Sequence, residues 1–206
     1  MIENIECETV QRIGNKFIIP NYIINLVIDW WEIPGTQDVF YGYEIRETGV
    51  KELSEDRKYS IRRNTIKGKM AEICEHLRLN IPIDFKMLLR SDIKGDGGVD
   101  VCLNINGINK EIDVKTRDSS PAGTKYGFLI SKQLLHKNRF FSVYTIIFDN
   151  RYDDPINRET ECLVYEYSGI LHASELRILR DDNKLVKSKF TKMWEVPEHY
   201  FLDRNK

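Results

Sequence analysis

The sequence has few of the residue patterns that define common metal-binding, nucleotide-binding or hydrolytic proteins. Its four cysteines form no CxxC pair and no spacing typical of zinc ligands. No Gly-Lys-Ser/Thr follows the glycine-rich stretch KGDGG, which excludes a P-loop. The four histidines lack metalloprotease spacing, and there is no Gly-x-Ser-x-Gly elbow. A structural zinc site and a disulfide framework are therefore not expected.

The chain also lacks long apolar runs and an excess of either charge. No apolar segment reaches the roughly 18 residues of a transmembrane helix, and no charged n-region precedes an apolar h-region. We therefore expect no signal peptide, no membrane span and a cytoplasmic location. With 31 basic and 32 acidic residues, the net charge of −1 gives no global indication of a nucleic-acid partner. The length of 206 residues suits one domain, to which an N-terminal subdomain can be added.

The strongest local signal lies in residues 94–117, KGDGGVDVCLNINGINKEIDVKTR. Asn106-Gly107 between alternating apolar and polar residues predicts a two-residue hairpin turn, because both turn positions need positive φ. Side chains alternate between the two faces of a hairpin, so one face is then apolar and the other polar. On the polar face, this register places Asp100 directly opposite Asp113.

The polar face of this hairpin predicts a site for a divalent cation. Facing carboxylates destabilise a hairpin, so the Asp100–Asp113 pair favours a cation between them. Carboxylate oxygens suit Mg²⁺ or Mn²⁺, and Lys115 lies one step along the same face. A purely structural hairpin, in which Lys115 neutralises the carboxylates, is the alternative. Glu111 shares the face nearer the turn and is expected to be solvated.

The clearest predicted helix covers residues 62–79, where one apolar stripe repeats at helical spacing: Ile66, Met70, Ile73 and Leu77. The helical repeat places Glu72 nearer the edge of the packed stripe and Glu75 almost opposite the centre of the stripe. Glu75 is therefore expected to point to solvent. Gly68, one turn before Glu72, weakens the helix by roughly 1 kcal/mol, which suggests the close approach of another group to that face. A surface ion pair with a lysine is the alternative role for Glu72.

The remaining segments alternate between helical and strand patterns. The run at 140–148 is nearly continuous in apolar residues, as in a strand buried on both faces. Trp30-Trp31 is interpreted as core packing in preference to a base-stacking platform. The mixture predicts an α/β fold with a mixed sheet flanked by helices. Helices are expected at 21–31, 130–137 and 173–179, strands at 39–47, 84–90, 140–148 and 161–167, and short β pieces within 5–19.

Taken together, Glu72, Asp100 and the triplet Asp113-Val114-Lys115 resemble the PD-(D/E)xK nuclease superfamily. Gly97-Gly98-Val99-Asp100 occupies the first half of that motif, with Val99 at the nominal proline. Gly68-x-x-x-Glu72 is similar to the helix motif of the branch that contains archaeal Holliday-junction resolvases and Mrr-type restriction enzymes. The resemblance covers roughly residues 62–150 and continues more weakly to 180.

The resemblance implies a restriction-endonuclease-like fold, with core order α-β-β-β-α-β and a mixed central sheet flanked by helices. Residues 61–206 would form this nuclease-like domain. Residues 1–60 have no counterpart in the resemblance and are assigned to an N-terminal α+β extension of unknown role.

The same resemblance implies a Mg²⁺-dependent DNA endonuclease that leaves 5′-phosphate and 3′-hydroxyl ends. Asp100, Asp113 and the Val114 carbonyl would hold Mg²⁺, with Mn²⁺ as a substitute, and Glu72 would ligate through water or help bind a second ion. Lys115 would orient or activate the attacking water. DNA is the expected partner, and many members of this branch form homodimers. A non-catalytic nucleic-acid-binding or interaction module that retains the fold is the alternative.

Two basic clusters on this neutral chain are candidates for binding a polyanion. No acidic residue interrupts the first one, between Ser119 and Phe140. Solvated helix faces are the alternative for both clusters. The candidate DNA contacts of the first cluster are Lys125, Lys132, Gln133, Lys137 and Arg139, and the second cluster contains Arg57, Lys58, Arg62, Arg63, Lys67 and Lys69.

Overall fold

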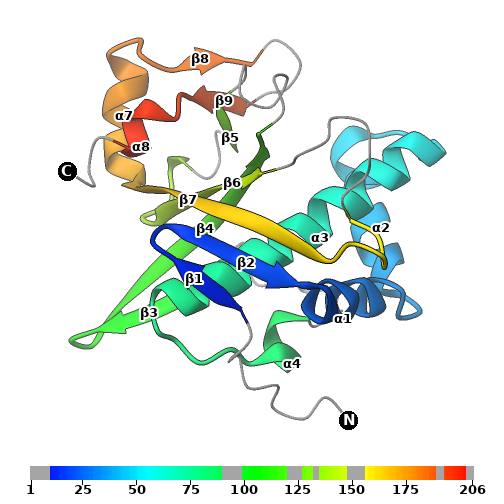
Figure 1. Ribbon diagram of the computed structural model, residues 1–206. Coiled ribbons are helices and arrows are strands. Elements are labelled where there is room, and N and C mark those ends of the chain that lie inside the picture. Colours follow the sequence, from blue (N-terminus) through cyan, green and yellow to red (C-terminus); the bar gives the residue numbers. More distant parts are fainter. Residues whose placement is uncertain are drawn as a thin grey trace.

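The computed structural model describes residues 10–89, 99–119, 127–131, 135–147, 156–188 and 193–202. It is a mixed α/β structure built on a six-stranded sheet with strand order β1-β2-β7-β6-β4-β3 (Figure 1). Strands β4 and β6 run parallel, and the other neighbouring pairs run antiparallel. The strands are β1 (Gln11–Ile13), β2 (Lys16–Pro20), β3 (Val101–Ile105), β4 (Ile108–Asp118), β6 (Phe140–Ile147) and β7 (Cys162–His172).

A smaller sheet and the helices complete the described structure. The three-stranded sheet has the order β5-β9-β8 and consists of β5 (Phe128–Ser131), β9 (Met193–Val196) and β8 (Val186–Lys187). None of the described helices has both the length and the apolar character needed to cross a bilayer. The helices are α1 (Asn21–Trp31), α2 (Thr36–Thr48), α3 (Glu55–Arg78), α4 (Phe85–Leu88), α7 (Ala173–Asp181) and α8 (His199–Leu202).

The β3–β4 hairpin confirms the predicted turn and its register. Asn106 and Gly107 have φ values of +53° and +81°, and the Gly107 N–H donates to the Asn104 side chain at 3.1 Å. Pairing runs from Ile105–Ile108 at the turn to Val101–Ile112 at the base. The apolar face is buried at the base but not at the tip, where Ile105 and Ile108 are 46% and 59% exposed. The hairpin therefore projects beyond the body of the protein (Figure 1).

Helix α1 confirms the predicted helix at 21–31, whereas the strand expected at 39–47 is wrong because that segment belongs to α2. The β-favouring aromatic residues of α2 pack on α1: the Phe40 and Tyr41 rings lie 5.3 and 5.9 Å from the Trp31 ring. Trp30 and Trp31 are 3% and 1% exposed, which confirms their interpretation as core. Tertiary packing has thus overridden local strand propensity.

Helix α3 is longer than predicted and is covered on two sides. It begins after Ser54, whose side chain accepts a hydrogen bond from the Arg57 N–H at 3.3 Å, a standard N-cap that the apolar stripe alone did not indicate. One side packs on β4 and the other contacts α1 and α2. Consequently the buried part of α3 extends well beyond the predicted stripe, to Ala71, Cys74 and Glu75.

The other face of the main sheet packs against the C-terminal elements. Phe141 and Val143 of β6 form a second buried cluster with Phe128, Leu176 and other residues of β5, α7, β9 and α8. Strand β6 is buried on both faces, as its sequence predicted. In β7, Gly169 has a φ of +140°, and a Cβ at this position would lie 2.3 Å from the Phe201 carbonyl oxygen of α8.

Two glycine substitutions are expected to change stability in opposite directions. Gly169→Ala places a methyl group against the Phe201 backbone, at a φ angle that only glycine readily adopts. We therefore expect the free energy of unfolding to fall by roughly 3 kcal/mol. Gly68→Ala is expected to raise the free energy of unfolding by up to about 1 kcal/mol. A Cβ at this position has no neighbouring described atom within 4 Å, so the side chain fits without strain. Urea unfolding of both variants measures the two changes. Equal effects of the same sign would contradict this assignment of the two glycines.

The remaining predicted strands and helices agree with the structure in part. The strand expected at 84–90 is wrong, because Phe85–Leu88 form the short helix α4. The helix expected at 130–137 falls partly outside the described residues, and its first residues belong to β5. The strand at 161–167 is confirmed and extends to His172 as β7. The helix at 173–179 is also confirmed, as α7 with His172 at its N-cap.

The N-terminal part of the chain belongs to the same sheet and core as the rest. Strand β2 pairs with β7, from Lys16–Glu166 to Pro20–Cys162. Phe17 and Ile19 are fully buried in the cluster that also contains β4, β6 and α3 residues. Residues assigned to an N-terminal extension thus add strands and core to the structure that carries the hairpin.

Candidate active site

The two faces of β4 carry different chemistry. Val114 pairs with Ser142, which donates a hydrogen bond to Glu75 of α3 at 2.9 Å, so this face looks toward α3. Asp113 pairs with Phe141, which belongs to the cluster on the opposite face. Because side chains alternate along a strand, Glu111, Asp113, Lys115 and Arg117 form a polar row on the face directed away from α3.

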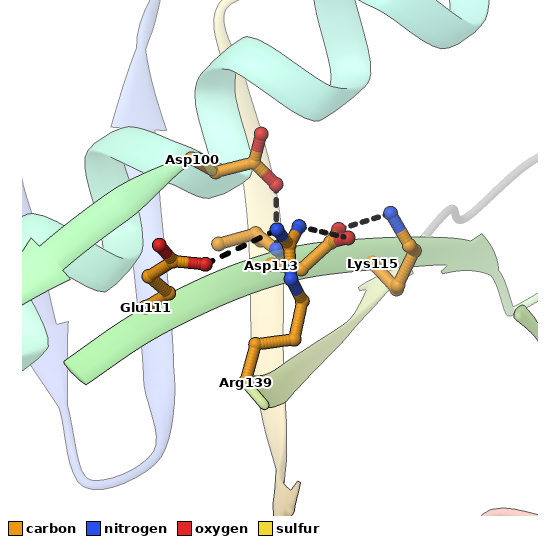
Figure 2. Close-up of polar contacts among 6 residues, drawn as sticks. Asp100, Glu111, Asp113, Lys115 and Arg139 are labelled. Carbon is orange, nitrogen blue, oxygen red and sulfur yellow. Dashed lines mark hydrogen bonds and ion pairs between the residues drawn. The ribbon is translucent and has the colours of Figure 1, made fainter. Parts of the chain in front are cut away.

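Asp100 lies just before β3, at the edge of this row. Its N–H donates to the Ile112 carbonyl at 3.1 Å, and its Oδ2 accepts the Val114 N–H at 2.6 Å (Figure 2). Burial, followed by the charge of Asp113, raises the pKa of Asp100 to about 6, against the opposing effects of Lys115 and the Val114 N–H. The predicted register thus brings the two aspartates close enough to repel each other.

Two cationic side chains contact Asp113, which is 3% exposed. Lys115 Nζ donates to Asp113 Oδ1, and Arg139 Nη1 lies 3.5 Å from Asp113 Oδ2. The second Arg139 nitrogen, Nη2, donates to Glu111 Oε2 at 3.2 Å, so one guanidinium bridges two acidic side chains of β4 (Figure 2). Arg139 itself is 2% exposed.

The structure corrects the predicted role of Arg139. A side chain this buried is no surface contact for DNA; it is part of the acidic site instead. The signal in the sequence was its position immediately before the strand predicted to be buried on both faces, where a charge needs a partner. Lys137 is exposed, as a DNA contact requires. The other three candidates, Lys125, Lys132 and Gln133, lie outside the described residues.

Glu72 lies on α3 beside Lys69, whose charge is among those that lower the pKa of Asp100. It is 7% exposed and pairs with Lys69 at 2.8 Å, on the helix that covers the opposite face of β4. The expectation that Glu75 points to solvent is wrong, because its carboxylate is fully buried. The Glu75 carboxylate accepts hydrogen bonds from Ser142, from Tyr144 at 2.7 Å and from Arg78 at 2.7 Å. The helix is buried on two sides, so a single-stripe argument misplaced this residue.

The basic cluster on α3 is largely engaged in ion pairs within the protein. Lys67 is 3% exposed and contacts Asp118 at 2.5 Å, and Arg63 pairs with the same carboxylate at 3.2 Å. Arg57 and Lys58 contact Glu44 and Glu55 respectively. These pairs favour a structural helix face over a free cationic surface.

A cavity of about 290 Å³, here called the β4 cavity, opens beside the acidic site. It lies where β4 separates from the beginning of β6 and the end of β7. Glu111 forms part of its wall, and the same Glu111 carboxylate is held by Arg139. Its lining residues are Ile108, Asn109, Lys110, Glu111, Asn138, Phe140 and His172.

The donor set at the site suits a hard divalent cation. Two carboxylates meet in a partly buried position, and the raised pKa of Asp100 shows the electrostatic cost that a cation would relieve. Within the described part of the chain, no group of three or more His, Cys, Asp or Glu side chains is arranged to hold a metal. Asp100 and Asp113 would be carboxylate ligands, and the role of Glu72 through water or at a second ion stays a prediction.

The comparisons with known proteins identify no relative: no family model, no curated protein and no solved structure matches the chain.

The cysteines at 74, 102 and 162 are free thiols.

Proposed function

We propose that this protein is a metal-dependent DNA endonuclease related to the PD-(D/E)xK superfamily. The observation that carries the proposal is the meeting of Asp100 and Asp113 at the base of the β3–β4 hairpin, with Lys115 on the same strand face and in contact with Asp113. Opposed carboxylates beside a lysine are costly for a fold unless they serve a site.

The order of elements around the site also supports the proposal. Helix α3, the β3–β4 hairpin and the parallel, buried strand β6 follow one another as the resemblance implies. Two departures are α4, which stands where the first core strand was expected, and β5, which takes up the first residues of the helix expected at 130–137. The restriction-endonuclease-like fold therefore remains part of the proposal.

Each residue has a distinct role in the proposed phosphodiester hydrolysis. Asp100 and Asp113 would hold Mg²⁺, which stabilises charge on the phosphate and lowers the pKa of a bound water. Lys115 leaves Asp113 to contact a non-bridging phosphate oxygen and orients the attacking water. Arg139 keeps Asp113 oriented. In-line attack leaves a 5′-phosphate and a 3′-hydroxyl.

Incubation with supercoiled, linear, single-stranded and four-way-junction DNA tests the proposal. We expect cleavage of at least one substrate with Mg²⁺ or Mn²⁺ and none with EDTA, and loss of cleavage in folded Asp113→Asn and Lys115→Ala variants. Asp38→Asn, which changes an exposed carboxylate of α2, is the matched control and should cleave normally. Full cleavage activity of both folded site variants would contradict the proposed nuclease function.

A non-catalytic nucleic-acid-binding or interaction module is the second candidate, favoured by one specific observation. Both Asp113 oxygens already contact cationic side chains, Lys115 and Arg139, so the charge of Asp113 is balanced within the protein. Calorimetry with Mg²⁺ and Mn²⁺ separates the candidates. Metal binding lost in Asp100→Asn supports the nuclease, and no metal binding by a protein that binds DNA supports the module.

A further inference from the structure

We propose that the β4 cavity binds an unpaired nucleobase of the DNA strand that passes the acidic site. This inference rests on the proposed nuclease function and adds a specificity for DNA that carries an unstacked nucleotide. Three features carry it: the cavity's position along β4, its aromatic wall and its polar rim.

The cavity adjoins the proposed position of the scissile phosphate. Glu111 in its wall and Asp113 in the site are two residues apart on the same strand face, a separation of about 7 Å. Stacked bases lie inside the duplex, so a base next to the scissile phosphate can enter a cavity in the protein only when it leaves the stack. Arg139 joins Glu111 to Asp113 and fixes the cavity relative to the site.

The aromatic wall consists of two rings that the fold holds in place. The Phe140 and His172 rings lie 4.8 Å apart at an angle of 60°. His172 is the N-cap of α7: its Nδ1 accepts the Ser174 N–H at 3.3 Å and lies 2.7 Å from Ser174 Oγ. Bases stack on such rings regardless of their identity, so the wall offers affinity without requiring a particular sequence.

The rim supplies polar groups that match a base and its phosphate. Asn109 and Asn138 are exposed at the cavity, and an amide can both donate to and accept from a base edge. Lys110 Nζ lies 6.0 Å from the centre of the Phe140 ring, where its charge can meet a phosphate. The volume of about 290 Å³ is at the lower limit of small-molecule pockets, which suits one base better than a whole nucleotide cofactor.

Binding without cleavage tests the inference. Duplex DNA with one unpaired 2-aminopurine and a fully paired duplex of the same sequence are titrated with the full chain in Ca²⁺, with anisotropy and 2-aminopurine fluorescence as readouts. The wild type is expected to bind the unpaired DNA more tightly and to quench its fluorescence by stacking. Phe140→Leu is expected to weaken that binding about fivefold or more and to leave binding of the paired duplex unchanged.

Two further variants guard against a trivial loss of fold. Asn138→Ala changes an exposed side chain and should also weaken binding of the unpaired DNA selectively. Lys187→Ala removes an exposed charge on β8 and should change neither affinity. Equal affinity of the wild type for both DNAs, or equal losses for both in the cavity variants, would overturn the inference. If Asp113-dependent cleavage persists in that case, the nuclease proposal stands; absence of all DNA binding and cleavage overturns both.

Discussion

Asp100→Asn is expected to abolish metal-dependent cleavage while stabilising the metal-free protein at neutral pH. Burial and the neighbouring Asp113 raise the pKa of Asp100 from 3.8 to about 6, so the folded state disfavours the charged carboxylate. The folded state then binds the proton more tightly than the unfolded state. Stability should therefore fall as the pH rises between these two values and stay lower above them. Asparagine carries no charge and can still accept the Val114 N–H, so it avoids this cost.

Thermal unfolding across this pH range, with and without Mg²⁺, measures the effect. Without metal, the variant should unfold at a higher temperature than the wild type near neutral pH, and the difference should shrink in acid. Mg²⁺ should raise the unfolding temperature of the wild type only. Cleavage should fall by at least about a hundredfold. A variant that is less stable than the wild type at neutral pH would contradict the electrostatic argument, and Asp38→Asn again serves as control.

Arg139→Met is expected to cost about 3 kcal/mol of unfolding free energy. The variant removes one of the two cationic side chains that contact the buried Asp113 carboxylate and leaves Lys115 as the other. The Arg139 side chain is 2% exposed and that of Asp113 is 4% exposed, so the cost lies at the low end of that for breaking a buried ion pair. Glu111→Gln is the matched control, because the Glu111 side chain is 45% exposed and its pair with Arg139 should contribute well under 1 kcal/mol. Urea unfolding gives both values.

A double-mutant cycle makes this prediction sharper. Asp113→Asn in the Arg139→Met background removes a buried charge that has lost one of its two cationic contacts, so it should recover part of the lost stability. In the wild-type background the same change breaks the pair and should destabilise. If Asp113→Asn lowers stability equally in both backgrounds, Arg139 acts through packing alone.

The sequence was most informative where structure is decided locally. Asn106 and Gly107 set the hairpin by their backbone preferences, and the register that follows brings Asp100 and Asp113 together. By contrast, the residues of α2 have a local preference for strand. The segment is helical because Phe40 and Tyr41 pack against Trp31. Gly35 and Gly49, both at positive φ, mark its two ends and were the available signal.

The errors at the site have one physical origin: sequence periodicity describes an element but not its neighbours. The stripe on α3 defines one packed side, whereas α1, α2 and β4 cover two sides and bury Glu75. Arg139 was assigned to a surface because its local segment is basic. Its carboxylate partners come from β4, more than twenty residues earlier in the chain. Only the parallel β4–β6 pairing brings them together.

The position of β7 in the main sheet has a consequence for how the protein folds. Among the described strands, the β1–β2 hairpin joins the sheet through β7, with Lys16 paired to Glu166, and β7 also borders β6. On the ribosome, β2 is made long before β7, so the edge of β2 that does not pair with β1 must wait for β7. Such distant pairing slows folding and leaves strand edges open in the meantime. The nascent chain is consequently more exposed to aggregation until β7 has emerged.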